Sequence, residues 1–498
     1  MRYFKNNSFL LLILFVHLSI FLINNSWDGS IIDYGFSVGN LSGIKTWYWE
    51  SSSNFQFIII KILFFIKNLT NLPNELIFDL FTITFLILFC VEIQKYAEQV
   101  FNLNKRNSQI CFIIALAYPV WNSLTEINLG LYLFCFYLAI LGYRFFNNKS
   151  FLIKFLGLLS IICSFSIKSN FAFVLALPFI DCFYNFLQKK KINYRPFVLI
   201  FLVCLLSYLI NIFYYPPYGN YAGYNQIQLN NIDLISLIEN IKNYFSFLLY
   251  FALGPVVFSI YFKFKFKKKI NLFNSKTIKA SLVLFIFFLI VLSPYILVEK
   301  STDIFNFVNF DSRHAYLTAI PISIFLSIFI SKISEKINLK ASIFLKNFII
   351  LQSLLILSLS YFVKYNSTLI DKNLVNSFQS FEEPKSGYVI IYSDELTRNF
   401  YHLNNLLYKS YNKAAWLAEI NKKSEFKKVS NKDFYLNNYK KIISIQAYPF
   451  KHVINDQINN CLTLFKLENE INTFEFIKKL HLLNHKKYFT LKKISEDC

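Results

Sequence analysis

The segment NELIFDLFTITFLILFCVEIQKYAEQVFN, residues 74–102, decides the fold class of this chain. Its apolar core, 75–93, is long enough for one bilayer crossing, which takes about 20 residues as an α-helix. In all, about 11 segments come near this standard. We therefore expect a mainly α protein, a polytopic transmembrane helical bundle. The predicted span cores are 9–23, 75–93, 109–121, 127–143, 151–167, 171–187, 197–213, 244–262, 280–298, 315–331 and 346–363.

The composition supports a membrane protein. Of the 498 residues, 55% are hydrophobic and only 16% are charged, which is too apolar for a soluble protein of this size. The formal net charge is +22, but lysine and arginine are spread between the apolar segments, where they orient a chain relative to the membrane. Membrane lipid is therefore an expected partner, and nucleic acid is not. KFKFKKK (263–269) is expected to anchor the inner leaflet.

The distribution of basic residues predicts the orientation. Arg2 and Lys5 precede the first apolar core, as in a signal peptide, but no small-x-small cleavage site follows Ile23, so we interpret the segment as a retained first helix. The other basic residues of the membrane part gather in alternate loops. The positive-inside rule then places the N-terminus in the cytoplasm and the protein in the cell (inner) membrane.

Two domains are expected. Residues 1–363 form the transmembrane domain, with a first outer loop at 24–74, and an odd number of spans puts the polar tail, 364–498, outside the membrane. GYVIIYSDE (387–395) and KKIISIQAY (440–448) have the composition of strands, and 396–420 has helical apolar spacing. The tail is therefore expected to be a small C-terminal α/β extracytoplasmic domain.

One apolar stretch, residues 55–67, is not expected to span. It is too short to cross the bilayer comfortably and it contains Lys61. A helix lying in the outer membrane interface suits it better.

The first outer loop carries acids beside the membrane surface, in WDGSIIDYGF (27–36). Asp28 or Asp33 would be placed to act as a general base for an incoming hydroxyl or amine while a phosphate leaves from a lipid-borne substrate. The alternative interpretation is that both are ordinary solvated loop acids. A divalent ion held by the pair is possible, but the spacing is not diagnostic, and we expect no metal or other cofactor.

The order of first helix, acidic outer loop and surface helix resembles the membrane glycosyltransferases of the GT-C superfamily. The similarity is to the branch of protein O-mannosyltransferases and the bacterial aminoarabinose transferase. It covers residues 1–190 in pattern and extends loosely to 363. The segments that carry it are WYWESSSNFQFIIIKILFFIKNL, then NELIFDLFTITFLILFCVEIQKYAEQVFN, SQICFIIALAYPVWNSLTEINLGLYLFCFYLAILGYRFF and FLGLLSIICSFSIKSNFAFVLALPFI.

The resemblance implies an enzyme that moves a sugar, with inversion, from a polyprenyl-phosphate donor to a glycan, lipid or protein acceptor on the outer face. The catalytic acid would lie in the first outer loop, as Asp28 or Asp33 does. Lys168 of SIKSN resembles a recurring lysine between the fifth and sixth helices and would contact phosphate; otherwise it is a snorkelling lysine at the interface. Glu50 occupies the region where the surface helix of the family approaches the site.

A second candidate region lies at the outer start of the tenth span. A cation is costly there unless it has a partner. Arg313 would hold the donor phosphate through its forked donors, or would pair with Asp311 at the helix end. Arg313, Tyr316 and Pro321 resemble a pattern of the family, an arginine at the start of a late helix followed by an aromatic residue and a proline, and both readings of Arg313 stay open. The candidate substrate- or phosphate-binding residues are thus Arg313, Lys168, Glu50, His314 and Tyr316.

Two other classes of function stay open. An O-antigen polymerase or ligase also uses lipid-linked glycans, but its functional arginines are usually in a large late outer loop, and here the loop at 299–314 is short. A polytopic transporter or flippase would be expected to show paired halves and glycine- or proline-broken helices. This chain has only 11 glycines and 11 prolines.

Overall fold

The computed structural model describes residues 41–72, 74–118, 120–121, 127–218, 238, 241–242, 244, 275–297, 310–336, 351–352, 355, 387–393, 442–448, 461–469 and 489–497. The chain divides into two compact units. The first contains the described helices and the second contains the described strands. Asp28, Asp33 and the predicted helix at 396–420 lie outside the described residues.

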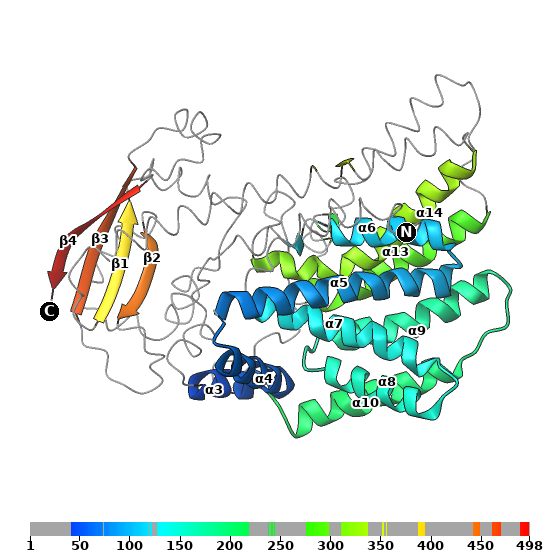
Figure 1. The fold of residues 1–498 in the computed structure, drawn as a ribbon, viewed down its shortest axis with the longest axis horizontal. Helices are drawn as coiled ribbons and strands as arrows, with labels where there is room; N and C mark the ends of the chain where they lie inside the picture. The colour runs from blue at the N-terminus through cyan, green and yellow to red at the C-terminus, as the bar shows by residue number, and fades with distance from the viewer. Residues whose placement is uncertain are drawn as a thin grey trace, which may run out of the picture. The chain divides into compact units, whose positions relative to one another are not determined.

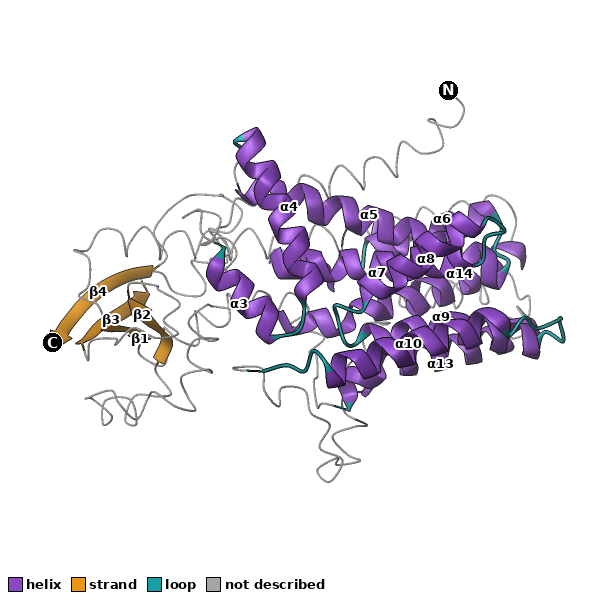
Figure 2. Ribbon diagram, turned by 90° about the horizontal axis from the view of Figure 1, so that it is seen from below, coloured by secondary structure: helices purple, strands orange, loops and turns teal. Residues whose placement is uncertain are grey.

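The first unit is mainly helical (Figure 1; Figure 2). Five helices among the described residues are long and apolar enough to cross a membrane. They confirm the predicted cores 75–93, 127–143, 171–187, 280–298 and 315–331 as apolar helices of membrane length. These helices are α5 (Asn74–Phe101), α7 (Ile127–Phe146), α9 (Asn170–Leu187), α13 (Ser275–Ile296) and α14 (Ala319–Lys336), the last preceded by the 3-10 helix η5 (Phe310–Thr318).

Three shorter apolar helices coincide with other predicted spans. They are α6 (Lys105–Leu116), α8 (Phe151–Ser164) and α10 (Arg195–Phe213). Most of the exposed large side chains of α8 and α10 are apolar, as expected of helices that face hydrocarbon, and the exposed charged residues Lys154 and Arg195 lie in the first turns of the two helices. The predicted spans at 9–23, 244–262 and 346–363 lie almost wholly outside the described residues.

Local sequence sets where these helices begin and end. The side chain of Asn104 accepts a hydrogen bond from the Asn107 N–H (2.9 Å) and so caps the start of α6. Proline in the first turn of α10 fits the helix start, where its missing N–H has no partner to lose.

Helices α7 and α8 pack closely at two glycines. A Cβ atom on Gly142 would lie 2.7 Å from the Gly157 carbonyl oxygen, and a Cβ on Gly157 would lie 2.7 Å from the Gly142 carbonyl oxygen. Both positions therefore need glycine, since the two backbones meet without room for a side chain.

Among the residues that the structure describes, two helices precede α5 along the chain. They are α3 (Ser42–Glu50) and α4 (Asn54–Thr70), and α4 crosses the direction of α5 in both views (Figure 1; Figure 2). A core of Ile44, Tyr48, Phe57, Ile60 and Leu63 holds them to the start of α5. Helix α4 confirms the prediction that residues 55–67 are helical.

The second unit contains a four-stranded mixed sheet in the order β2-β1-β3-β4. Strand β1 pairs antiparallel with β2 and parallel with β3, and β3 pairs antiparallel with β4. The predicted strands at 387–395 and 440–448 are confirmed. The strands are β1 (Gly387–Ser393), β2 (Ile442–Tyr448), β3 (Cys461–Asn469) and β4 (Phe489–Asp497).

Candidate functional site

Several candidate residues lie at the end of the helical unit where α5 begins. Because consecutive helices reverse direction, the α3–α4 corner, the α8–α9 turn and the end of α10 all meet there (Figure 1). The hydrogen bonds and ring contacts described next connect these segments, although they are far apart in sequence. We call this region the α5-start end.

Two serine hydroxyls fix the α3–α4 corner at the α5-start end. The Ser53 hydroxyl donates to the Ser166 carbonyl oxygen in the α8–α9 turn (3.2 Å), and the Ser52 hydroxyl donates to the Tyr215 carbonyl oxygen after α10 (2.7 Å). Ser52 has φ 58°, a left-handed conformation that costs a non-glycine residue about 1 kcal/mol. The hydrogen bond to Tyr215 helps to offset that cost.

Glu50, a predicted substrate-binding residue, belongs to the same corner. It is the last residue of α3 and is half-buried. Its carbonyl oxygen accepts a hydrogen bond from the Tyr218 backbone N–H (3.1 Å), so this residue is attached to the segment that follows α10.

The α8–α9 turn that carries Lys168 is joined to His314 through two residues that sequence reasoning missed. Lys168 is in the α8–α9 turn, and the hydroxyl of its neighbour Ser169 lies 3.0 Å from the Tyr295 hydroxyl at the end of α13. The Tyr295 ring lies 4.9 Å from the His314 ring, measured between centroids. The signal for Tyr295 was its place beside a proline at the outer end of a predicted span. We call Lys168, Ser169, Tyr295 and His314 the Lys168–His314 cluster.

The two charged members of this cluster differ in exposure. The Lys168 side chain is exposed at the surface, yet partial desolvation by the surrounding protein lowers its pKa below the ordinary lysine value of 10.5. His314 is buried, with 3% of its surface exposed. The cluster thus combines a lysine that can reach a soluble or lipid-borne group with an imidazole held inside the protein.

Tyr316 is in the core. It is fully buried, and its ring lies 5.0 Å from the ring of Trp121. Nearby, the Tyr118 and Thr318 hydroxyls are 2.7 Å apart, which joins the end of α6 to η5. A substrate contact through Tyr316 would require this packing to open, and its role stays a prediction.

The side chains of three other candidates lie outside the described residues. Arg313 is in η5, but its side chain lies outside the described residues, as do Asp28 and Asp33. Their roles stay predictions.

Two buried amide oxygens beside the α8–α9 turn have no hydrogen-bond donor in the described part of the chain. They are Asn170 Oδ1 and Asn54 Oδ1. The amide of Asn170 is fixed by its Nδ2, which donates to the Ser164 carbonyl oxygen (2.9 Å). A buried acceptor without a donor costs about 1–3 kcal/mol, so this region is suited to a group that brings a hydroxyl or N–H.

A second polar cluster lies toward the other end of the helices. The buried Glu92 carboxylate of α5 accepts two hydrogen bonds from Arg144 of α7, from Nε to Oε2 (2.6 Å) and from Nη2 to Oε1 (2.9 Å). Lys95 Nζ lies 3.0 Å from Oε1. Since both carboxylate oxygens are already occupied by cations of the protein, we assign this cluster a structural role.

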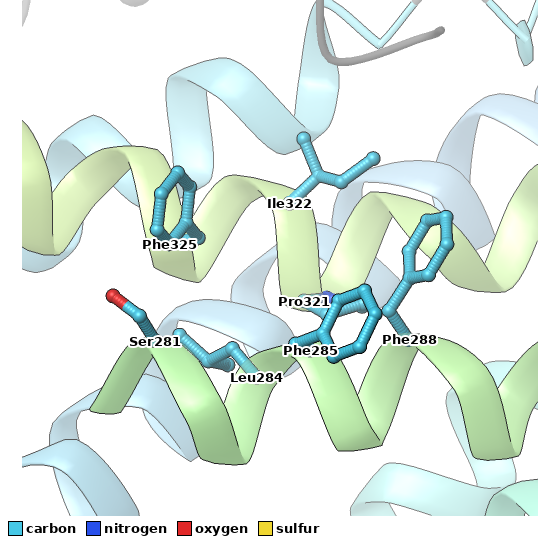
Figure 3. A pocket seen from close by; sticks show the side chains of 7 residues that line it. All are labelled: Ser281, Leu284, Phe285, Phe288, Pro321, Ile322 and Phe325. Atoms are coloured by element: carbon cyan, nitrogen blue, oxygen red, sulfur yellow. The ribbon is translucent and has the colours of Figure 1, made fainter. Parts of the chain in front are cut away.

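The cavity between α13 and α14 is also a poor candidate for a catalytic site. It has a volume of about 70 Å³ and contains one polar lining side chain, Ser281, and no charged one (Figure 3). The lining residues are Ser281, Leu284, Phe285, Phe288, Pro321, Ile322 and Phe325.

Neither a metal site nor a known relative identifies the function. Among the described residues, no group of three or more His, Cys, Asp and Glu side chains is arranged to hold a metal ion. The chain matches no protein-family model, no curated protein and no solved structure.

Proposed function

We propose that the protein is an integral membrane glycosyltransferase that moves a sugar from a polyprenyl-phosphate donor to a glycan, lipid or protein acceptor on the outer face of the cell membrane. The proposal includes about 11 spans, a cytoplasmic N-terminus and an extracytoplasmic C-terminal domain. In this topology the α5-start end faces outward.

The observation that supports this proposal is the Lys168–His314 cluster. Lys168 and His314 were selected from segments far apart in sequence, and a continuous contact through Ser169 and Tyr295 joins those segments. Glu50 lies at the same end of the helices, through the α3–α4 corner. A phosphate-linked substrate at the membrane surface requires a cation and polar groups at one end of the bundle, and this is the arrangement of the described candidates.

The proposed reaction is a direct displacement. Asp28 or Asp33 takes the proton of the acceptor hydroxyl or amine, and the acceptor atom attacks the anomeric carbon of the sugar. The bond from that carbon to the phosphate oxygen breaks, polyprenyl phosphate leaves with the electron pair, and the configuration inverts. Lys168 and Arg313 stabilise the negative charge on the leaving phosphate through charge-assisted hydrogen bonds.

The test is sugar transfer by the purified protein in lipid vesicles, with synthetic polyprenyl-phosphate sugars as donors. Lys168→Met should raise the KM for the donor about tenfold or more, because a hydrogen bond to a charged group contributes about 1.5–3 kcal/mol. Lys149→Met is the matched control. Lys149 is an exposed lysine in the α7–α8 turn, and its loss should leave the donor KM unchanged.

Two results would count against the proposal. Equal donor KM in both lysine variants would remove Lys168 from the phosphate site. Absence of transfer with every donor would contradict the transferase, and a flippase assay with the same donors would then follow.

A further inference from the structure

The α4 helix has an exposed, continuous apolar stripe that no other described segment covers. Its residues follow helical spacing and lie on one face. Phe65 and Leu69 are the most exposed, at 66% and 73%. The stripe consists of Ile58, Ile62, Phe65, Ile66 and Leu69.

A different face of α4 is already used for packing. Phe57, Ile60 and Leu63 are buried against Phe78 of α5 and the end of α3. The helix is therefore apolar on two faces, of which the described part of the protein covers one. A contiguous exposed apolar surface of this kind marks a contact with another apolar phase or partner.

Most of the charged residues around the stripe are basic. Between Ser42 and Thr70 the two helices carry three lysines and one acid, Glu50. Lys61 Nζ lies 5.1 Å from the centroid of the Phe57 ring, and Lys45 Nζ lies 5.3 Å from that of Trp49. Among the described residues, neither lysine forms an ion pair with a carboxylate. Their charges are thus available to an anionic surface.

Aromatic residues complete the pattern of an interfacial element. Trp49 of α3 is 41% exposed and packs edge-on against Phe57, with 5.9 Å between the ring centroids. Exposed tryptophan is typical of the membrane–water interface. Because α4 crosses the direction of α5, its stripe can lie along a bilayer surface while α5 crosses the bilayer (Figure 1; Figure 2).

We propose that α3 and α4 form a docking surface for an anionic bilayer leaflet. The stripe of α4 enters the boundary between headgroups and acyl chains, and Lys45 and Lys61 bind the phosphates of anionic lipids. The apolar area and the basic charge act together, as in amphipathic helices that lie in the interface. This docking surface does not depend on the glycosyltransferase proposal.

The experiment uses the full-length protein with the photoreactive residue p-benzoylphenylalanine in place of Phe65. The protein is reconstituted in vesicles of equimolar phosphatidylcholine and phosphatidylglycerol and irradiated, and the lipid adducts are identified by mass spectrometry. The readout is the ratio of phosphatidylglycerol to phosphatidylcholine adducts. Substitution at Leu69 provides a second site on the stripe, and substitution at Leu205, exposed in the middle of α10, is the matched control.

We expect lipid adducts at Phe65 and Leu69 with phosphatidylglycerol enriched up to about fivefold for each nearby lysine. The ratio at Leu205 should equal that of the bulk lipid. In the Lys45→Gln/Lys61→Gln background the enrichment should disappear, whereas Lys45→Arg/Lys61→Arg should keep it.

Three results would overturn the inference. Adducts only to protein at both stripe positions would mean that another protein surface covers the stripe. Lipid adducts without enrichment would show an apolar contact that does not select anionic lipid. Enrichment that survives the double glutamine variant would show that these lysines do not bind the headgroups.

Discussion

Replacing Arg144 by Met should destabilise the helical unit more than any exposed charge substitution. Arg144 supplies two of the hydrogen bonds to the Glu92 carboxylate, whose side chain is only 4% exposed. Removing one partner of a buried ion pair costs about 3–5 kcal/mol, because the other charge stays buried without compensation.

A second cation near Glu92 lowers the cost expected for Arg144→Met. Lys95 still approaches the carboxylate at 3.0 Å after Arg144 is lost, although its own side chain is 43% exposed. We therefore expect a loss of about 2–4 kcal/mol in the free energy of unfolding. The double variant Glu92→Gln/Arg144→Met should lose less than Arg144→Met alone, since it leaves no uncompensated charge. Lys95→Met should cost at most about 1 kcal/mol, as for other exposed pairs.

The assay is unfolding of the purified protein by SDS in mixed micelles, with the loss of helix followed by circular dichroism. Wild type, Glu92→Gln, Arg144→Met and the double variant form a double-mutant cycle, and Lys95→Met is the exposed control. If Arg144→Met and Lys95→Met lose the same free energy, the pair does not stabilise the contact between α5 and α7. If the double variant is less stable than Arg144→Met, the reasoning about the uncompensated charge is refuted.

Three further predictions concern packing, hydrogen bonding and pH. Gly142→Leu should destabilise the protein by at least about 1–3 kcal/mol, because even its Cβ would lie 2.7 Å from the α8 backbone. Leu159→Ala, on the exposed side of α8, should have little effect in the same unfolding assay. Thr318→Val should cost about 0.5–1.5 kcal/mol, since it removes the 2.7 Å hydrogen bond between the buried Thr318 and Tyr118 hydroxyls. A change below the error of the unfolding assay would contradict this. If Lys168 binds the donor phosphate as a cation, donor affinity should fall as rising pH removes its proton. The fall should start at a lower pH than for a lysine with the ordinary pKa of 10.5, because desolvation lowers the pKa of Lys168 in the folded protein. Lys168→Arg stays charged and should abolish that fall in a donor-binding titration; the same fall in the arginine variant would exclude Lys168 as its source.

Hydropathy predicted the long helices well, because the bilayer imposes a minimum apolar length on each span. It predicted the boundaries of α6 less well. The predicted core at 109–121 begins four residues after Lys105, where the helix starts under the Asn104 cap. The cap is a short-range hydrogen bond that an apolar-length criterion does not detect.

The sequence predicted β1 and β2 but not β3 and β4. The sequence of β4, FTLKKISED, is too polar to resemble a buried strand. Ion pairs with β3 help to explain why β4 joins the sheet. Glu468 of β3 forms ion pairs with Lys466 and with Lys492 of β4, and these contacts lower the pKa of the Glu468 carboxyl. Such pairing across strands depends on register, which the composition of one segment does not contain.

The candidate site, too, could be predicted from the sequence only in part. Lys168 was selected from a resemblance and His314 from its position at the outer start of a span, and the structure joins their segments through Ser169 and Tyr295. Ser169 has no charge or motif that marks it in the sequence, and Tyr295 is marked only by the adjacent Pro294 near the end of a predicted span. Tyr316 was selected for its position after Arg313, but burial against Trp121 is a property of tertiary packing.

The central claim, transfer of sugar by an outward-facing acid, is tested most directly with the two first-loop aspartates. The measurement compares initial rates of sugar transfer by wild type, Asp28→Asn and Asp33→Asn in lipid vesicles, with one synthetic polyprenyl-phosphate sugar and a water-soluble acceptor. A correctly folded variant that lacks the general base should be slower by about 10²–10⁴-fold, and the other variant should retain activity. Full activity in the double variant Asp28→Asn/Asp33→Asn would contradict the claim.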